Sequence, residues 1–250
     1  MIRWELDGYE VGFTTRVGGV SEGPYASLNL GRKSGDEVER VDENRRIVCD
    51  AIGADLEKLA LNYQVHSARV LHAAPAMRGE HADGLWTDEP GLPILAMSAD
   101  CLPIVLARAG ASEPAVAVLH AGWRGLLEGI AAAGAQALRL EASPAQPATP
   151  GRKSLGDVTL TAAIGPGIGP CCYEVGEEVS APFRERFGDD VVRERRLDLW
   201  TSAERALRAA GVARVERFDR CTACEPETFF SHRRDAGNTG RQGVIAYVAG

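Results

Sequence analysis

The sequence predicts a mixed α/β or α+β domain, and two features of its patterning indicate this fold class. Short apolar runs bounded by Gly, Pro or Asp recur along the chain, which is typical of buried strands. Between them lie segments whose apolar residues repeat every three to four positions, as in amphipathic helices. The 250-residue chain shows no internal repeat. We therefore expect one domain over residues 1–250, with the Pro- and Ala-rich stretch at about 141–157 as a surface loop.

The first half of the chain begins with a predicted strand at 9–17, followed by a Gly-, Pro- and Ser-rich loop through Gly35. A helix is expected from Asp36 to Ile52, where Gly53 stops it. Cys49 lies on the apolar face of this helix and is expected in the core. Further strands are expected at 69–73, 92–98, 103–107 and 115–119.

The second half continues with a predicted helix from Arg124 to Leu138 and a strand beginning at 158. Thr201 and Glu204 resemble a capping box that opens a helix ending at Ala210. The remaining elements are expected to be a helix with Val175, Val179, Phe183 and Phe187 on one face, and strands near 213–218 and 243–248.

Composition limits the function classes. Apolar residues make up 45% and charged residues 25%, which is ordinary for a globular protein. The net charge of −7 argues against a nucleic-acid partner, and no apolar run approaches membrane-spanning length. No apolar secretion segment follows the first residues, so we expect a cytoplasmic protein with reduced cysteines and no membrane partner.

A thiol and two imidazoles stand near the ends of predicted strands. Cys101 follows one apolar run, His120 ends the next, and His66 precedes another. If the three converge at a sheet edge, they suit zinc, and three ligands leave a fourth position for water or substrate. Copper(I) accepts the same donors.

Two other interpretations of these residues stay open, because their spacing is not a local metal-binding motif. In the first, Cys101 is a nucleophile and His120 its base, without metal. In the second, Cys101 is a small buried residue and each histidine a loop residue with ordinary hydrogen bonds.

Several longer motifs identify a family. "FTTRVGGVSEGPYASLNLG", "QVHSARV", "AVAVLHAGWRGLLEGI", "AAIGPGIGPCCYEVGEEV" and "FFSHRRDAGNTGRQG" occur in this order. From about Phe13 to Gly243 the chain resembles the laccase-domain family, also called multicopper polyphenol oxidase, purine nucleoside phosphorylase or peptidoglycan editing factor. The resemblance implies a four-layer αββα fold shared with a group of cysteine hydrolases, and zinc ligands at His66, Cys101 and His120.

The activity that the resemblance implies is zinc-dependent phosphorolysis of adenosine, inosine, guanosine and methylthioadenosine, together with adenosine deamination. Guanidinium groups suit the phosphate, and Arg16 and Arg233 are the candidates unless they are ordinary surface arginines. Asp83 and Asp100 are candidates for moving protons or orienting a ligand histidine, unless they only form turns.

The alternatives to this activity are a hydrolase that edits peptidoglycan precursors through the Cys101–His120 dyad, and a copper polyphenol oxidase. Laccase-type copper oxidases need many histidines in His-x-His pairs, whereas this chain has five histidines and no such pair. The sequence does not indicate whether the chain forms oligomers.

The "GPGIGPCCYEV" segment lacks the glycine spacing of nucleotide-binding motifs and is expected to form a rigid turn between a strand and a helix, with an anion-binding loop as the alternative. Cys171 and Cys172, with Cys221 and Cys224, offer four sulfurs. Because a vicinal pair is a poor tetrahedral spacing, we do not expect a second metal site there.

Overall fold

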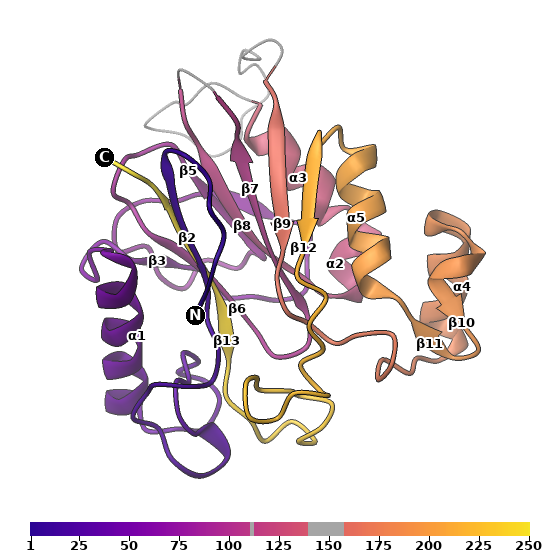
Figure 1. Ribbon diagram of the computed structural model, residues 1–250, viewed down its shortest axis with the longest axis horizontal. Helices are drawn as coiled ribbons and strands as arrows, with labels where there is room; N and C mark the ends of the chain where they lie inside the picture. The colour runs from indigo at the N-terminus through magenta and orange to yellow at the C-terminus, as the bar shows by residue number, and fades with distance from the viewer. Residues whose placement is uncertain (111–112, 140–157) are drawn as a thin grey trace.

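The computed structural model describes residues 1–110, 113–139 and 158–250, and within them two β-sheets pack face to face between outer helices (Figure 1). Helix α1 (Val38–Ile52) covers the outer face of one sheet. Helices α2, α3 and α5 cover the outer face of the other, and α4 packs against α2 and α5 at the side of the molecule. The predicted mixed fold with αββα layers is therefore confirmed. The loop expected at 141–157 lies outside the described residues.

The sheet under α1 has five strands in the order β1-β2-β13-β6-β3. Strand β13 is central and pairs antiparallel with both β2 and β6. The strands are β1 (Ile2–Arg3), β2 (Tyr9–Phe13), β13 (Gln242–Val248), β6 (Ile94–Ser98) and β3 (Ala60–Leu61).

The second sheet has six strands in the order β12-β9-β7-β8-β5-β4. Its centre is antiparallel, while β12 and β4 add parallel to β9 and β5 at the two edges. The strands are β12 (Arg214–Arg217), β9 (Leu160–Ile164), β7 (Leu102–Arg108), β8 (Val116–Ala121), β5 (Gly84–Thr87) and β4 (Val70–His72). A short ribbon, β10 (Val192–Arg193) with β11 (Arg196–Leu197), precedes α5.

Burial on both faces explains why the central strands are continuous apolar runs. In β7, Ile104 and Leu106 pack under the helices, whereas Val105 and Ala107 pack against the other sheet. Strand β13 divides in the same way, since Val244 and Ala246 face the other sheet while Ile245 faces α1. Successive side chains point to opposite faces of a strand, so both faces must be apolar here.

Helix α1 ends at Gly53 as predicted, and the glycine adopts φ +73°. The prediction for Cys49 is confirmed as well, because the residue is fully buried in the core between α1 and the sheet. The buried Asn44 side chain donates to the carbonyl oxygens of Ser27 and Asn29. The helix thereby holds the preceding loop in place.

Two helix predictions need correction. The helix expected from Arg124 to Leu138 is two helices, α2 (Trp123–Glu128) and α3 (Ile130–Ala137), because Gly129 between them has φ +96° and breaks the right-handed path. Helix α5 (Leu199–Ala209) begins earlier than expected: Asp198 is its N-cap and accepts from the backbone N–H of Thr201. Thr201 is therefore not the cap, and Glu204 pairs with Arg217 instead of closing a capping box.

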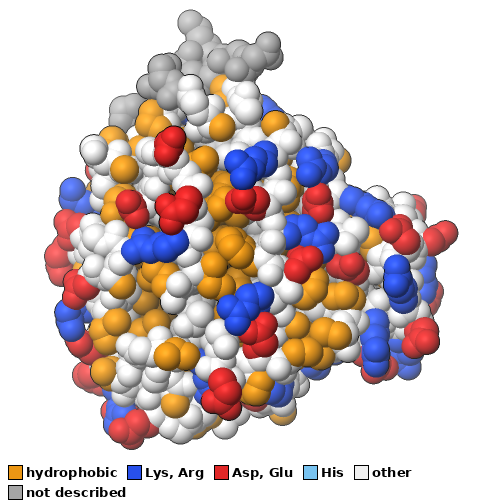
Figure 2. Space-filling model, in the orientation of Figure 1, with side chains coloured by type: hydrophobic (Ala, Val, Ile, Leu, Met, Phe, Trp, Pro, Cys, Tyr) orange, Lys and Arg blue, Asp and Glu red, His pale blue; other side chains and the backbone are white. Residues whose placement is uncertain are grey.

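The remaining helices are α4 (Glu177–Phe187) and two 3-10 turns, η1 (Gly23–Tyr25) and η2 (Asp189–Val191). None of the helices in the described part of the chain is long and apolar enough to cross a membrane. On the face in Figure 2, acidic and basic side chains are interspersed, which agrees with many short-range ion pairs such as Arg217–Glu204.

Candidate metal centre

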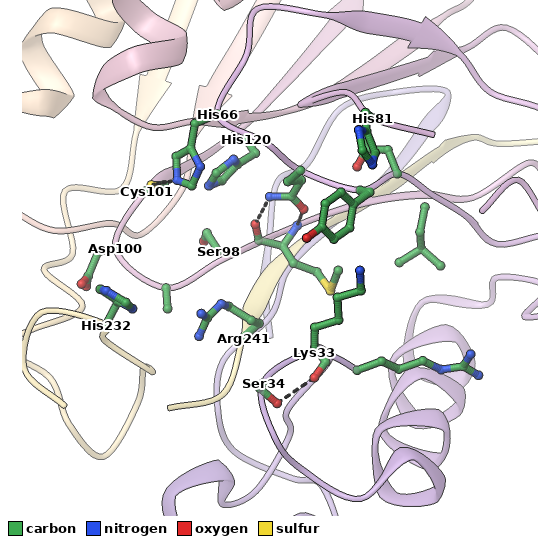
Figure 3. Close-up of a pocket in the computed structure, with 18 of the residues that line it drawn as sticks. Lys33, Ser34, His66, His81, Ser98, Asp100, Cys101, His120, His232 and Arg241 are labelled. Carbon is green, nitrogen blue, oxygen red and sulfur yellow. Dashed lines mark hydrogen bonds between the residues drawn. The ribbon is translucent and has the colours of Figure 1, made fainter. Parts of the chain in front are cut away.

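Three side chains from separate loops and strands meet at one end of a pocket (Figure 3). His120 lies in β8, Cys101 in the turn between β6 and β7, and His66 between β3 and β4. One donor atom from each lies within 4.8 Å of the others. The Cys101 Sγ is 3.9 Å from His66 Nε2, and the two imidazole centroids are 4.9 Å apart. This is the donor set and spacing that one metal ion with three protein ligands requires.

Asp83 positions two of these ligands. Its fully buried carboxylate accepts backbone hydrogen bonds from Val65, His66 and Ser67 and one from the Ser67 hydroxyl. The same carboxylate lies 2.9 Å from His120 Nδ1. A proton on Nδ1 leaves Nε2 as the donor atom toward Cys101 and His66. Asp83 therefore fixes both the loop that carries His66 and the orientation of His120.

The Asp100 side chain positions the third ligand. Asp100 adopts φ +91°, a left-handed backbone conformation that is unusual for a residue other than glycine. Its Oδ1 accepts from the Thr222 hydroxyl at 2.6 Å and its Oδ2 from the Arg233 backbone N–H at 2.7 Å. These contacts fix the turn in which Cys101 directly follows Asp100.

The charges around Cys101 and His120 favour a thiolate beside an imidazolium. Burial raises the pKa of the Cys101 thiol, but His120 and His66 outweigh burial and lower it to about 6. Burial lowers the pKa of His120, yet the Cys101 and Asp83 charges raise it to about 9. For Asp83, burial opposes ionisation, and hydrogen bonds from His120 and Ser67 bring the pKa down to about 2. The ionised thiol is the form that binds metal or acts as a nucleophile.

Gly122 gives these ligands room. A Cβ at this position would stand 3.0 Å from Cys101 Sγ and 3.0 Å from His66 Cδ2. The main effect of Gly122 is to leave space for the two side chains, because any side chain at this position would push the sulfur or the imidazole aside.

The pocket has a volume of about 650 Å³, within the range of small-molecule sites. The ligand group closes one end, while Lys33 and Ser34 lie at the other (Figure 3). The lining carries several cations, namely Lys33, Arg32, Arg45, Arg78, Arg233 and Arg241. A small anionic or polar ligand would meet a positive lining next to His66, Cys101 and His120.

The sequence-predicted residues divide into two groups. His66, Asp100, Cys101, His120 and Arg233 line the pocket. Asp83 lies behind the lining, with no exposed surface.

Arg16, which was expected to bind phosphate, does not line the pocket. Its guanidinium donates to the carbonyl oxygens of Ala26 and Pro226 and stacks on Phe230. Those contacts hold two loops together, and the structure therefore does not bring Arg16 to the site.

Sequence reasoning missed other lining residues, among them Asn62, Ser98, Tyr173, His232 and Arg241. Each stands in a loop or at the end of a strand with no periodic or spacing signal. Only the fold shows that they face one cavity.

The "GPGIGPCC" segment is a turn, as favoured from the sequence, and its residues 165–169 are packed in the interior. A Cβ on Gly165 would stand 2.2 Å from the Phe13 ring, and one on Gly169 would stand 2.5 Å from the Trp200 ring. Close packing thus accounts for these glycines. Ile168 in the same turn reaches the pocket.

Comparison with known proteins gives four further findings. The family model described as multi-copper polyphenol oxidoreductase laccase matches residues 10–249. "Purine nucleoside phosphorylase YlmD" of Geobacillus stearothermophilus is 36% identical over 96% of this chain and 90% of its own length. "Purine nucleoside phosphorylase YfiH" of Escherichia coli K12 is 36% identical over 94% of this chain and 92% of its own length. The crystal structure of YlmD from Geobacillus stearothermophilus superposes with a TM-score of 0.83 at 34% identity, covering 98% of this chain and 93% of that one.

We expect Asp83→Asn to weaken Zn²⁺ binding by about ten- to a hundredfold, because a carboxylate that orients a ligand histidine commonly contributes this much affinity. The measurement is competition with a chelator of known affinity. Asp88→Asn is the matched control, since Asp88 pairs with His72 at 3.0 Å in the same manner but outside the pocket. Equal Zn²⁺ affinity in the two variants would contradict the role assigned to Asp83.

The Cys101–His120 pair predicts how Zn²⁺ affinity depends on pH. Between the pKa of Cys101 at about 6 and that of His120 at about 9, the metal-free pair carries one proton that metal must displace. Affinity should therefore rise about tenfold per unit between pH 7 and 8.5, with about one proton released. Calorimetry in buffers of different ionisation enthalpy counts that proton. A flat affinity over this window would contradict the ion pair.

Proposed function

The chain belongs to the multi-copper polyphenol oxidoreductase laccase family, and we propose that it is a purine nucleoside phosphorylase that also deaminates adenosine. The observation that carries this proposal is the convergence of His66, Cys101 and His120 at the end of a cation-lined pocket. The two relatives described above are named purine nucleoside phosphorylases, which supports the same assignment.

Zinc is the metal proposed for His66, Cys101 and His120. One thiolate and two imidazoles are donors that Zn²⁺ prefers, and the buried Asp83 carboxylate behind His120 is typical of such sites. When bound with one open position, zinc would polarise a substrate atom or lower the pKa of a bound water. Copper is the competing metal, but five histidines without a His-x-His pair do not suit a multi-copper oxidase.

Phosphate is proposed to bind at Arg233, together with Arg241, which lines the same pocket. In phosphorolysis, phosphate attacks the ribose C1′ while the purine leaves, so the anion must be held next to the sugar. Arg241 lines the pocket, and burial lowers its pKa despite the opposing charges of Cys101 and Asp100. A guanidinium remains charged under these conditions and matches phosphate oxygens in bidentate geometry.

The purine is proposed to meet Asn62 and Ser98. Both side chains are buried in the pocket lining, and within the described residues neither the Asn62 amide nor the Ser98 hydroxyl has a hydrogen-bond partner. Buried polar groups are normally paired, and an amide offers both a donor and an acceptor to the edge of a purine. Adenosine, inosine, guanosine and methylthioadenosine are the proposed substrates.

Deamination needs water as the nucleophile and a group that moves a proton. Asp100 lines the pocket and is the proposed proton carrier, whereas Asp83 has no exposed surface and acts by orienting His120. The lowered pKa of Cys101 keeps the sulfur ionised near neutral pH, as a ligand requires.

One observation favours a second candidate function. A Cys101 thiolate beside a protonated His120 is also the arrangement of a cysteine hydrolase, which would act on an amide bond in a peptidoglycan precursor. That mechanism needs neither metal nor His66. The two candidates therefore differ in their response to a chelator and to loss of His66.

We expect purified protein with adenosine and phosphate to yield adenine with ribose 1-phosphate, and inosine from the second reaction. His66→Ala should lower both rates at least a hundredfold, because a site with two remaining ligands binds metal poorly. His72→Gln, which changes a histidine outside the pocket, should keep both rates. Chelation should abolish the products and Zn²⁺ restore them. Full formation of these products in chelator would contradict the role of zinc, whereas cleavage of a precursor amide by His66→Ala protein, without purine products, would favour the hydrolase.

We expect Arg233→Met to raise the KM for phosphate about tenfold, consistent with loss of a charge-assisted hydrogen bond of about 1.5 kcal/mol. Deamination should be unchanged, because phosphate takes no part in it. Arg195→Met is the control, since Arg195 pairs with the same residue, Glu174, to which Arg233 donates, but lies on the surface. Steady-state kinetics of both reactions test this, and an unchanged KM for phosphate would remove Arg233 from the phosphate site.

A further inference from the structure

A second group of potential ligands lies outside the pocket. Cys171 and Cys172 follow β9, and Cys221 and Cys224 follow β12. One sulfur from each lies within 4.8 Å of the others. The two segments run side by side below the six-stranded sheet, joined by a β-bridge between Gly167 and Cys221 (Figure 1).

The separations of the sulfurs fit a single ion. Cys224 Sγ lies 3.5 Å from Cys171 Sγ and 3.3 Å from Cys172 Sγ. Four sulfurs placed tetrahedrally at a Zn–S distance of about 2.3 Å stand about 3.8 Å from one another. All four cysteines are free thiols. The cluster is therefore close to the geometry of a four-thiolate site without any backbone rearrangement.

Local turns explain how a vicinal pair can contribute two ligands. The backbone N–H groups of Cys172 and Tyr173 both donate to the Gly169 carbonyl, so this segment curls tightly instead of extending. In an extended strand successive side chains would point apart. On the other segment, the N–H groups of Cys224 and Glu225 both donate to the Cys221 carbonyl, which folds the Cys-x-x-Cys sequence into a turn.

Packing alone does not account for the cluster. Cys49 shows what a structural cysteine looks like in this protein, since it is fully buried among aliphatic side chains. Cys171 and Cys224 are exposed, where a small apolar side chain gains little. In addition, the Gly169 N–H donates to Cys221 Sγ at 3.3 Å, an interaction that favours the ionised sulfur.

We propose that Cys171, Cys172, Cys221 and Cys224 bind a structural zinc ion. Four thiolates close its coordination sphere, so this ion has no position for substrate, in contrast to the three-ligand group in the pocket. Each thiol that coordinates gives up its proton to solvent, and the bound ion ties the segment after β9 to the segment after β12.

The four cysteines lie directly behind the wall of the pocket. Ile168 and Tyr173, next to the first cysteine pair, line the cavity, as does Arg233 on the other segment. Thr222, which follows Cys221, donates to the Asp100 carboxylate. The ion therefore secures the segments that hold the turn before Cys101.

The test is metal analysis of the full-length protein, purified under reducing conditions with Zn²⁺ and freed of loosely held ions on a desalting column. We expect two zinc ions per chain. Cys221→Ser/Cys224→Ser protein should hold one, and His66→Ala protein should also hold one, having lost the other site. Cys49→Ala is the control for removing a remote cysteine and should keep two.

Cobalt separates this proposal from the proposed function. Co²⁺-loaded protein should show an intense sulfur-to-cobalt charge-transfer band. In Cys221→Ser/Cys224→Ser the band should fall to the weaker contribution of the single Cys101 thiolate, and in His66→Ala most of it should remain, whether or not the protein acts on purines. Cys171→Ser, at an exposed position, tests the site without a large change to the fold, and its Zn²⁺ should pass to a chelator at least tenfold faster.

Two results would overturn the proposal. The first is a zinc content and cobalt spectrum that the double serine substitution leaves unchanged. The second comes from protein that was never oxidised and is denatured with chelator, without reductant, before alkylation. Fewer than six alkylated cysteines would then assign disulfides to these sulfurs.

Discussion

The buried carboxylate of Asp83 is the contact on which the site depends. A charge without solvent is costly unless donors surround it, and here three backbone N–H groups, one hydroxyl and one imidazole do so. The Asp83 carbonyl oxygen also accepts from the His120 backbone N–H at 2.7 Å. His120 is thus held through both its backbone and its ring, and the loop with His66 is held by the same group. Satisfying one buried charge therefore assembles two of the three ligands.

The two-sheet architecture supplies the third ligand. Strand β6 belongs to one sheet and β7 to the other, so the turn between them must cross the interface between the sheets. Residues 99–101 make this crossing, and it places the Cys101 sulfur where the loop from β3 arrives. Residues 99–101 are closely packed, because a Cβ at either Gly122 or Gly167 would collide with this crossing segment or its neighbours. The donors meet because the sheets must connect there.

The sequence predicts the central strands well, because β7, β8 and β13 are buried on both faces and appear as continuous apolar runs. Strand β5 escaped prediction because it is four residues long and begins with glycine. The break at Gly129 and the cap at Asp198 depend on backbone angles that helical periodicity does not report. The αββα order of the layers was expected from the resemblance to a family and not from the sequence pattern. The lining residue Arg241 and the meeting of the four sulfurs depend on which loops become neighbours, and that is a property of the tertiary fold.

Strained backbone conformations connect the group of His66, Cys101 and His120 with the segments that carry the four cysteines. His66 and Asp100 both hold positive φ angles, +63° and +91°, and such conformations persist only where the surroundings fix them. For His66, Asp83 provides the restraint. For Asp100 the restraints come from Thr222, from the Arg233 backbone, and from the Ile168 N–H that donates to its carbonyl at 2.8 Å. All three lie on the two segments that carry the four cysteines. The geometry at Cys101 is thus maintained from outside the pocket. The zinc ion proposed for the four cysteines would fix those segments and so hold the strained turn in the conformation that directs the Cys101 sulfur toward the two histidines.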